Sequence, residues 1–153
     1  DKRVTFNFGV GGNNKANSSS WIINDFISNF IKTSKLKENI DSYTEAPWGH
    51  HVALFEDENY KLKELVVKPS SKLSLQYHHH RSEHWIVIKG KATVKLGDDT
   101  FDVSEGNYVF IPKGETHRLI NNTNQDLMLI EIQTGEILEE SDIVRIEDSY
   151  NRV

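Results

Sequence analysis

The chain has 153 residues, of which 37% are hydrophobic and 10% aromatic, enough for one domain with a core of its own. Its formal net charge of -5 argues against nucleic acid as a partner, because proteins that neutralise phosphates carry a basic face. The absence of cysteine excludes disulfides, thiolate metal sites and a cysteine nucleophile. The sequence shows no membrane-spanning run and no signal-peptide pattern, so we expect no membrane partner and a cytoplasmic location.

The first 45 residues are predicted to form an extension of the main domain. Residues 9–20 read GVGGNNKANSSS, which is typical of a loop. In residues 21–36 apolar side chains recur at helical spacing, and Ser19 or Ser20 can cap the N-terminus. The sequence therefore predicts a loop followed by an amphipathic helix. Two placements stay open for this helix: exchange with a second copy of the chain, or cover of the open end of its own domain.

Residues 46–153 are predicted to form one all-β domain. Nine short segments rich in β-branched and aromatic residues follow one another at intervals of about ten residues, separated by Gly, Pro, Asp and Asn. This pattern indicates a β-sandwich or a small barrel. Gly97, Asp98 and Asp99 form a predicted hairpin tip, so residues 92–96 should pair with residues 100–103. The acidic stretch after Gly135 is expected to wrap the barrel without joining its sheets.

The segment LSLQYHHHRSEHW holds a dense group of potential metal ligands. Side chains alternate between faces in a strand, so Gln76 and His78 point the same way, and Glu83 follows after a short excursion. A separate segment, GNYVFIPKGETHRLIN, places His117 at the start of a strand after a Pro/Gly turn. His78 and His80 form a competing same-face pair, which leaves only two residues before Glu83. A histidine-rich surface turn without a metal is the third alternative.

These two segments resemble the paired motifs of the cupin superfamily. The second motif matches at every fixed position from Gly106 to Asn121, whereas the first has Ser70 and Gln76 where cupins carry glycine and histidine. The resemblance implies a cupin jelly-roll barrel in which four side chains meet at one divalent metal: Gln76, His78, Glu83 and His117. Nitrogen and oxygen ligands without thiolate suit zinc, with manganese, iron, cobalt or nickel as alternatives.

Longer stretches, from APWGHHVALFE to LMLIEIQTGEILEESDIVRIEDSYNR, resemble the type II mannose-6-phosphate isomerase domain. That domain usually forms the C-terminal part of bifunctional enzymes that begin with a mannose-1-phosphate guanylyltransferase. The resemblance implies a metal-dependent isomerase that interconverts mannose 6-phosphate and fructose 6-phosphate and so feeds GDP-mannose or surface polysaccharide synthesis. The chain departs from the family at Ala46, where the family reads arginine, and at Gly106, where it often reads asparagine.

The same resemblance suggests roles for residues around the barrel mouth. It points to Glu131 and His84 as carriers of the proton between C1 and C2 of the sugar, and to Arg145 as needed for activity. We prefer Glu131, because strand alternation turns His84 to the face opposite Glu83. Contacts with a sugar phosphate are expected from a group dominated by arginines, whose forked guanidinium suits phosphate: Arg81, Arg118, Arg145, Tyr150 and Arg152.

Assembly and substrate leave further alternatives. A homodimer is expected, because the edges and apolar faces of cupin sheets are commonly closed by a second copy. Ala46 and the first 45 residues also favour a related cupin isomerase or epimerase that acts on another sugar phosphate or a nucleotide sugar. A module that binds a sugar or a metal without catalysis is the last alternative.

Overall fold

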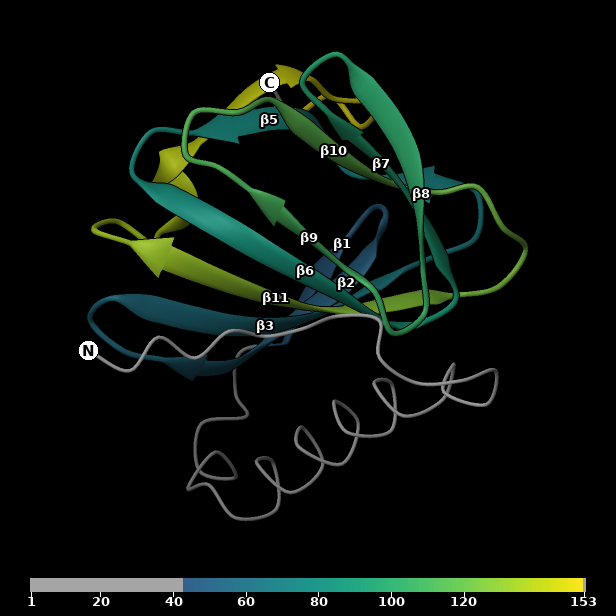
Figure 1. Cartoon of the computed structure of the whole chain (residues 1–153), viewed down its shortest axis with the longest axis horizontal. Helices are drawn as coiled ribbons and strands as arrows, with labels where there is room; N and C mark the ends of the chain where they lie inside the picture. The colour runs from purple at the N-terminus through teal and green to yellow at the C-terminus, as the bar shows by residue number, and fades with distance from the viewer. Residues whose placement is uncertain (1–42, 153) are drawn as a thin grey trace, which may run out of the picture.

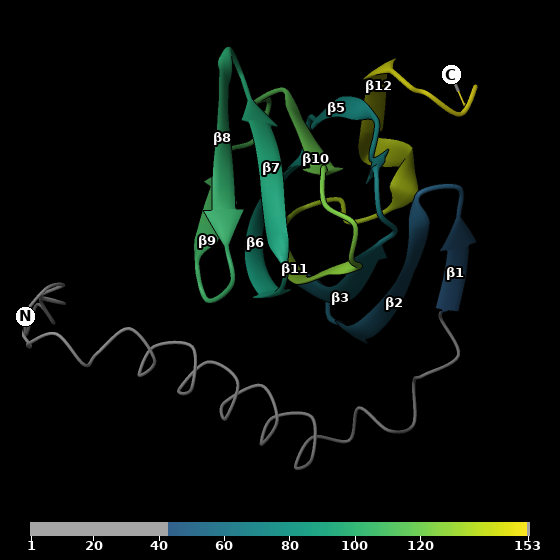
Figure 2. The same cartoon turned by 90° about the vertical axis from the view of Figure 1, so that its right-hand side faces the viewer.

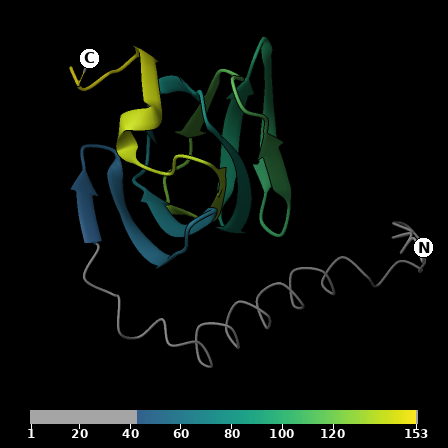
Figure 3. The same ribbon diagram turned by 90° about the vertical axis from the view of Figure 1, so that its left-hand side faces the viewer.

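The computed structural model describes residues 43–152, which form two antiparallel β-sheets that face each other (Figure 1). Figures 2 and 3 show the same sheets from two sides, curved around a shared interior. The predicted all-β architecture is confirmed. The predicted N-terminal loop and helix lie outside the described residues, and the domain division after residue 45 stays a prediction. Among the described residues, no helix has the length and apolar character needed to cross a membrane.

The first sheet, which we call sheet A, contains strands from most of the described chain. Its strands lie in the order β1–β2–β3–β11–β6–β9, and each neighbouring pair is antiparallel. The bounds are β1 Tyr43–Ala46, β2 Gly49–Glu56, β3 Tyr60–Val67, β11 Leu127–Gly135, β6 Arg81–Lys89 and β9 Tyr108–Ile111.

The second sheet, sheet B, has the order β12–β5–β10–β7–β8, and the short strand β4 also pairs with β10. The bounds are β12 Ile143–Glu147, β5 Leu75–His78, β10 His117–Asn121, β7 Lys91–Leu96, β8 Asp99–Ser104 and β4 Ser71–Lys72. The predicted hairpin is confirmed, because Ala92 pairs with Val103 and Leu96 with Asp99 across β7 and β8.

The expectation for the chain after Gly135 is wrong in one respect. A short 3-10 turn, η2 (Glu140–Asp142), leads into β12, which joins sheet B antiparallel to β5. The strand contains Ile143, Val144 and Ile146, whose branched side chains favour extended backbone. The acidic composition of the region concealed this strand.

The turn before β4 explains one departure from the cupin motif. Ser70 has a φ of 54°, in the left-handed region that glycine adopts without strain. The leading glycine of the motif therefore serves a backbone conformation that the chain keeps with serine. The motif position is a matter of turn geometry and does not affect the ligands that follow.

The inward positions of both sheets change character along the interior. At one end they are apolar and form the core, with Leu65, Trp85, Leu119 and Leu129 among its buried members. At the other end the inward positions of the same strands are polar, as at Glu83 on β6. Because side chains alternate in a strand, this change within single strands creates a polar chamber at one end of an otherwise apolar interior.

Candidate metal centre

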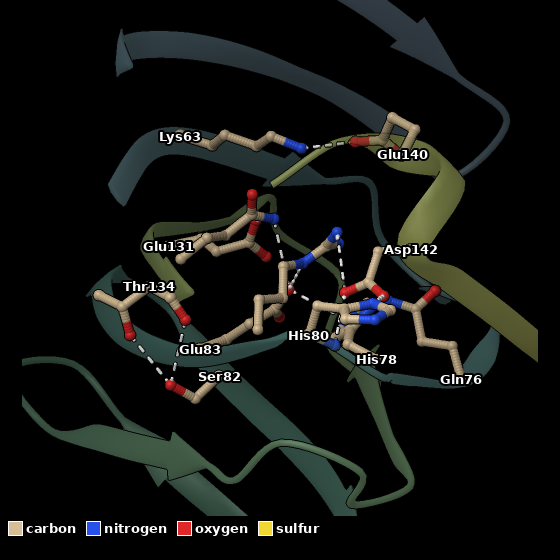
Figure 4. A network of polar contacts seen from close by, with 12 residues as sticks. Lys63, Gln76, His78, His80, Ser82, Glu83, Glu131, Thr134, Glu140 and Asp142 are labelled. Carbon is tan, nitrogen blue, oxygen red and sulfur yellow. Dashed lines mark hydrogen bonds and ion pairs between the residues drawn. The ribbon is translucent and has the colours of Figure 1, made fainter. Parts of the chain in front are cut away.

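Two histidines and a glutamate from three strands meet in that chamber. Potential ligand atoms of His78 on β5, Glu83 on β6 and His117 on β10 lie within 4.8 Å of one another, and all three side chains are buried. His78 Nε2 lies 3.0 Å from Glu83 Oε1, and His117 Nε2 lies 3.8 Å from Glu83 Oε2. Figure 4 shows His78 and Glu83 close together inside the molecule. The carboxylate comes from sheet A and both imidazoles come from sheet B, so the cluster joins the two sheets.

The imidazoles carry nitrogen atoms suited to a cation. Within residues 43–152, neither ring nitrogen of His78 nor Nε2 of His117 has a partner in hydrogen-bond geometry, although all three atoms are buried and Nε2 of His78 lies 3.0 Å from Glu83 Oε1. Buried polar atoms normally have partners. His117 Nδ1 lies 2.8 Å from the carbonyl oxygen of Glu115, and because a carbonyl only accepts, Nδ1 is the donor. Nε2 then keeps its lone pair, as in the neutral histidine that binds a metal.

Gln76 lies beside this cluster. It is the direct partner of His117 in the β5–β10 pair, so their side chains point to the same face. Gln76 is buried, and its Oε1 accepts a hydrogen bond from Ser74 Oγ at 2.7 Å. His80, the alternative in the competing frame, instead holds Asp142, with 2.7 Å from Nδ1 to Oδ1 and a side chain that is 43% exposed. The structure thus places Gln76 in the chamber and His80 outside the cluster.

Glu83 is held as an anion. Three side chains donate hydrogen bonds to its carboxylate: Arg81 Nε at 3.1 Å, Trp85 Nε1 at 3.1 Å and Gln133 Nε2 at 3.3 Å. Burial alone would raise the pKa of Glu83, but the close contacts of its carboxylate with His78, His117 and Arg81 outweigh burial and hold that pKa below the usual range. Burial also lowers the pKa of His117, which favours its neutral form. An anionic carboxylate beside neutral imidazole is the charge state that a divalent metal requires.

A second buried carboxylate, Glu131, lies next to Glu83. Gln133 Nε2 donates to its Oε1 at 2.7 Å and Trp85 Nε1 donates to its Oε2 at 3.1 Å, so both glutamates share these two donors. Burial, followed by the negative charge of Glu83, raises the pKa of Glu131 to about 8. The two carboxyl groups therefore have different protonation states at neutral pH. Neighbouring acids with pKa values driven apart are typical of catalytic sites.

A cavity of about 310 Å³ opens onto these groups, a size at the lower end of small-ligand pockets. Residues of both sheets line it, together with the turn η2. The predicted site residues among its lining are Gln76, Arg81, Glu83, Glu131, Arg145 and Arg152. The cavity thus brings two of the four predicted ligands and three predicted arginines to one place, while His78 and His117 are not among its lining residues.

The three arginines of the cavity differ in their hydrogen-bond partners. Arg81 is already bonded within the protein, since it donates hydrogen bonds to Glu83 and, at 2.8 Å, to the carbonyl oxygen of Glu139. Arg145 pairs with Gln76 across β12 and β5, and its buried Nε has no hydrogen-bond partner within the described chain. Arg152 donates to both oxygens of Asp148, at 2.8 and 2.9 Å. Arg145 and Arg152 are the arginines best placed to meet a ligand.

Three predicted residues lie away from the cavity. Arg118 follows the inward-facing His117, so alternation turns it outward, where it donates to Glu147 at 3.1 Å. His84 packs its ring on Phe110, with 4.7 Å between centroids, on the side of β6 opposite Glu83. Tyr150 packs against the core and carries the Arg152 guanidinium 5.3 Å from its ring centre. For Arg118 and His84 the structure gives no contact with the cavity, because strand alternation points them to the outer faces.

Several cavity residues escaped the sequence prediction. Lys63 is only 5% exposed, lies directly opposite Glu131 in the β3–β11 pair and places Nζ 2.6 Å from Glu140 Oε1. Figure 4 shows this ion pair along one side of the chamber. A signal existed for Lys63, since it shares a face with the core residue Leu65. Gln133 could also have been predicted from the sequence, because it follows Glu131 by two residues and therefore points to the same face of the strand.

Comparison with known proteins identifies the family to which the chain belongs. Residues 32–148 match the family described as mannose-6-phosphate isomerase C-terminal. The chain is 47% identical over 106 residues to the xanthan biosynthesis protein XanB of Xanthomonas campestris pv. campestris (strain B100), a match that covers 69% of this chain and 23% of XanB. It is 44% identical over 107 residues to the mannose-1-phosphate guanylyltransferase ManC of Salmonella typhimurium (strain LT2), covering 70% and 22%. The chain therefore spans less than a quarter of the length of these curated relatives.

Solved structures agree on the architecture. Oxalate decarboxylase from Bacillus subtilis at pH 4.6 superposes with a TM-score of 0.62 at 20% identity, covering 69% of this chain and 30% of that chain. The Schizosaccharomyces pombe Cnp3 cupin domain superposes with a TM-score of 0.55 at 16% identity, covering 60% and 68%. At such identities the likeness shows the fold alone, which is the cupin fold. Because the family match extends over most of the chain, this protein belongs to the mannose-6-phosphate isomerase C-terminal family.

Proposed function

We propose that the cavity binds a phosphorylated sugar at a divalent metal and interconverts mannose 6-phosphate and fructose 6-phosphate. The observation that carries this proposal is the pair Glu83 and Glu131, which share two hydrogen-bond donors in one cavity and whose surroundings shift their pKa values in opposite directions. An aldose–ketose isomerisation moves a proton between neighbouring carbons, so it needs a polarised carbonyl and one acid–base group. Membership of the isomerase family supports the same reaction.

The metal would be held by two imidazole nitrogens, one carboxylate and one amide oxygen. The residues are His78, His117, Glu83 and Gln76, and their donor atoms fit a cation because Nε2 of each histidine is buried without a partner in hydrogen-bond geometry among the described residues. Zinc suits such a set, with manganese, iron, cobalt or nickel as alternatives. When bound, the ion supplies the Lewis acidity that polarises the sugar carbonyl.

Glu131 would carry the proton between C1 and C2. Its two oxygens are fixed by Gln133 and Trp85, so the carboxyl group has a defined orientation in the cavity. Its pKa of about 8 reflects burial and the charge of Glu83. Positive charge added at Glu83 would lower this pKa toward neutrality, where a carboxyl group both accepts and donates a proton.

Arg145 and Arg152 would bind the phosphate. Arg145 lines the cavity with a buried Nε that has no hydrogen-bond partner in residues 43–152. Two of the three guanidinium nitrogens of Arg152 bind Asp148, which fixes the orientation of the group at the cavity wall. A guanidinium held in this way is preorganised for a phosphate oxygen.

A coupled assay tests the proposal. Metal-stripped protein is supplied with single metals and with mannose 6-phosphate, and the formation of fructose 6-phosphate is followed together with metal content. We expect turnover that depends on the metal and is lost in Glu131→Gln, which retains its metal. His84→Gln is the matched control, since His84 lies on the other face of β6, and should turn over normally. Binding of mannose 6-phosphate without conversion by the metal-loaded protein would instead identify a non-catalytic module.

A further inference from the structure

Sheet A has a second apolar face, on the side turned away from the core. We call this side the outer face of sheet A. Its central positions include Leu62 and Val66 on β3, Met128, Ile130 and Ile132 on β11, and Ile86 on β6, with Glu64 and His84 as the polar side chains among them. They are direct cross-strand neighbours, as in Leu62 with Ile132 and Ile86 with Ile130. At the β9 edge the face continues into Tyr108 and Phe110, which are 64% and 45% exposed.

The outer face of sheet B is different. On β7 the outward positions are Lys91, Thr93 and Lys95, while the inward Ala92 and Val94 belong to the core. This is the alternation expected of an antiparallel sheet with one solvated face. Strand β11 lacks that alternation, because its outward Met128, Ile130 and Ile132 are also apolar, and β6 lacks it in its second half, where Ile86 and Ile88 point outward. Strands that are apolar on both sides are typical of sheets covered on both sides.

We propose that residues 21–36 of this chain form an amphipathic helix that covers the outer face of sheet A. Apolar side chains recur through this segment at the spacing of one helix face: Ile22, Ile23, Phe26, Ile27, Phe30 and Ile31. Ser28 and Lys32 fall on the opposite side of such a helix. An amphipathic helix of this kind gains most of its stability by burying its apolar side against a partner surface.

Chain connectivity favours this occupant over other surfaces. Residues 37–42 are the only link between the segment and β1, and β1 is the edge strand of sheet A. Six extended residues reach about 20 Å. From β1 to β11 there are three strand spacings, or about 15 Å. The segment therefore reaches the centre of the outer face of sheet A directly, whereas sheet B lies across the core.

The family match supports the same occupant. It begins at residue 32, inside the segment and ahead of the first described strand. The end of the segment thus falls within the stretch that matches the family, as a covering element of its sheet would. The proposal concerns the cover of the fold and is independent of the proposed isomerase activity.

Cysteine cross-linking tests the proposal cleanly, because the chain has no cysteine of its own. Ile27→Cys is combined in the full chain with one of three partners on the outer face: Val66→Cys, Ile86→Cys or Ile132→Cys. We expect at least one pair to form, under mild oxidation, a disulfide within the monomer that migrates faster and reverts on reduction. Ser28→Cys with the same partners is the matched control and should lose this band, since its side chain points away from the sheet.

Two outcomes would overturn the proposal. The first is the absence of an intramonomer disulfide in all three pairs while circular dichroism shows the strand content of the parent chain. The second is a disulfide between chains only, detected by mixing a chain that carries Ile27→Cys with one that carries Ile132→Cys, which would assign the surface to a second copy. Should the paired variants fail to fold, single variants decide: Ile27→Asp should lower Tm and Ser28→Asp should leave it unchanged, and equal Tm values would count against the helix cover.

Discussion

Glu83 and Glu131 show how one polar chamber produces two chemically different acids. Both are buried, and both accept hydrogen bonds from Trp85 and Gln133. The difference lies in charge, because Glu83 has His78, His117 and Arg81 around it, whereas Glu131 has Glu83 as a neighbouring anion. The proposed metal ligand and the proposed proton carrier thus lie on two neighbouring strands, β6 and β11.

The raised pKa of Glu131 predicts how the stability of the metal-free protein depends on pH. Between its ordinary pKa of 4.5 and its folded pKa of about 8, the folded chain keeps a proton that the unfolded chain has released. Stability contributed by this group is therefore complete below about pH 4.5 and is lost as pH rises toward 8, by on the order of 4 kcal/mol. Glu131→Gln removes this contribution, so the loss between pH 5 and pH 8 should shrink.

Urea unfolding of the metal-free protein and of Glu131→Gln at both pH values measures this effect. The readout is the difference in the free energy of unfolding between pH 5 and pH 8. Replacing a carboxyl oxygen by the amide group of glutamine removes one hydrogen-bond acceptor at both pH values, so this effect cancels in the difference. An unchanged pH dependence in the variant would show that Glu131 ionises normally in the folded protein.

The proposed metal centre predicts that substitutions at two histidines differ in their effect on zinc affinity. His117→Ala should lower zinc affinity by more than about 100-fold, because even residues that only orient metal ligands contribute about 10–100-fold. His84→Ala, on the outer face of sheet A, should bind zinc like the parent chain. Competition with a fluorescent chelator gives both affinities, and equal losses in the two variants would mean that the cluster of His78, Glu83 and His117 is not the binding site.

At the scale of elements, the turn η2 secures the loop that joins two of the proposed ligands. Asp142 is buried and accepts hydrogen bonds from the backbone N–H groups of His79 and His80, at 3.1 and 3.2 Å. These residues lie between His78 at the end of β5 and Glu83 in β6. The acidic C-terminal region thus helps to position the loop between His78 and Glu83.

Removal of this carboxylate predicts a loss of stability. Asp142→Ala should lower the free energy of unfolding by about 2–4 kcal/mol, because two backbone donors and the His80 ring lose a buried acceptor. Ser141→Ala is the matched control, since Ser141 is exposed and should change stability by less than about 0.5 kcal/mol. Urea titrations of both variants make the comparison, and similar midpoints would show that the loop does not depend on Asp142.

At the scale of the whole molecule, the candidate centre connects the two sheets. Glu83 belongs to sheet A, whereas His78 and His117 belong to sheet B, so a bound ion would link the layers across the interior. Ligands that bind only the folded chain stabilise it in proportion to the logarithm of their concentration. Metal occupancy and global stability should therefore be coupled in this protein.

Addition of zinc tests that coupling. At a free concentration of about 100 times Kd, zinc should raise the free energy of unfolding by about 2.7 kcal/mol, and excess chelator should reverse the gain. Glu83→Gln should abolish most of it, because the variant removes the ligand that sheet A contributes. Calorimetric scans with and without zinc give the change in Tm. An unchanged Tm of the parent protein on addition of zinc would contradict a metal centre that spans both sheets.

The amino-acid sequence by itself determined the all-β fold, the hairpin after Leu96 and the isomerase family, because alternation, turn residues and motif spacing are local features of the chain. Tertiary structure alone decided which face of each strand meets the cavity. Lys63 lies opposite Glu131 and β12 joins β5 through pairings between residues far apart in sequence, whereas alternation within the strand had already predicted that His84 lies on the face opposite Glu83. Period-two alternation shows which residues share a face, but only long-range strand pairing turns that face toward the chamber or toward the outside.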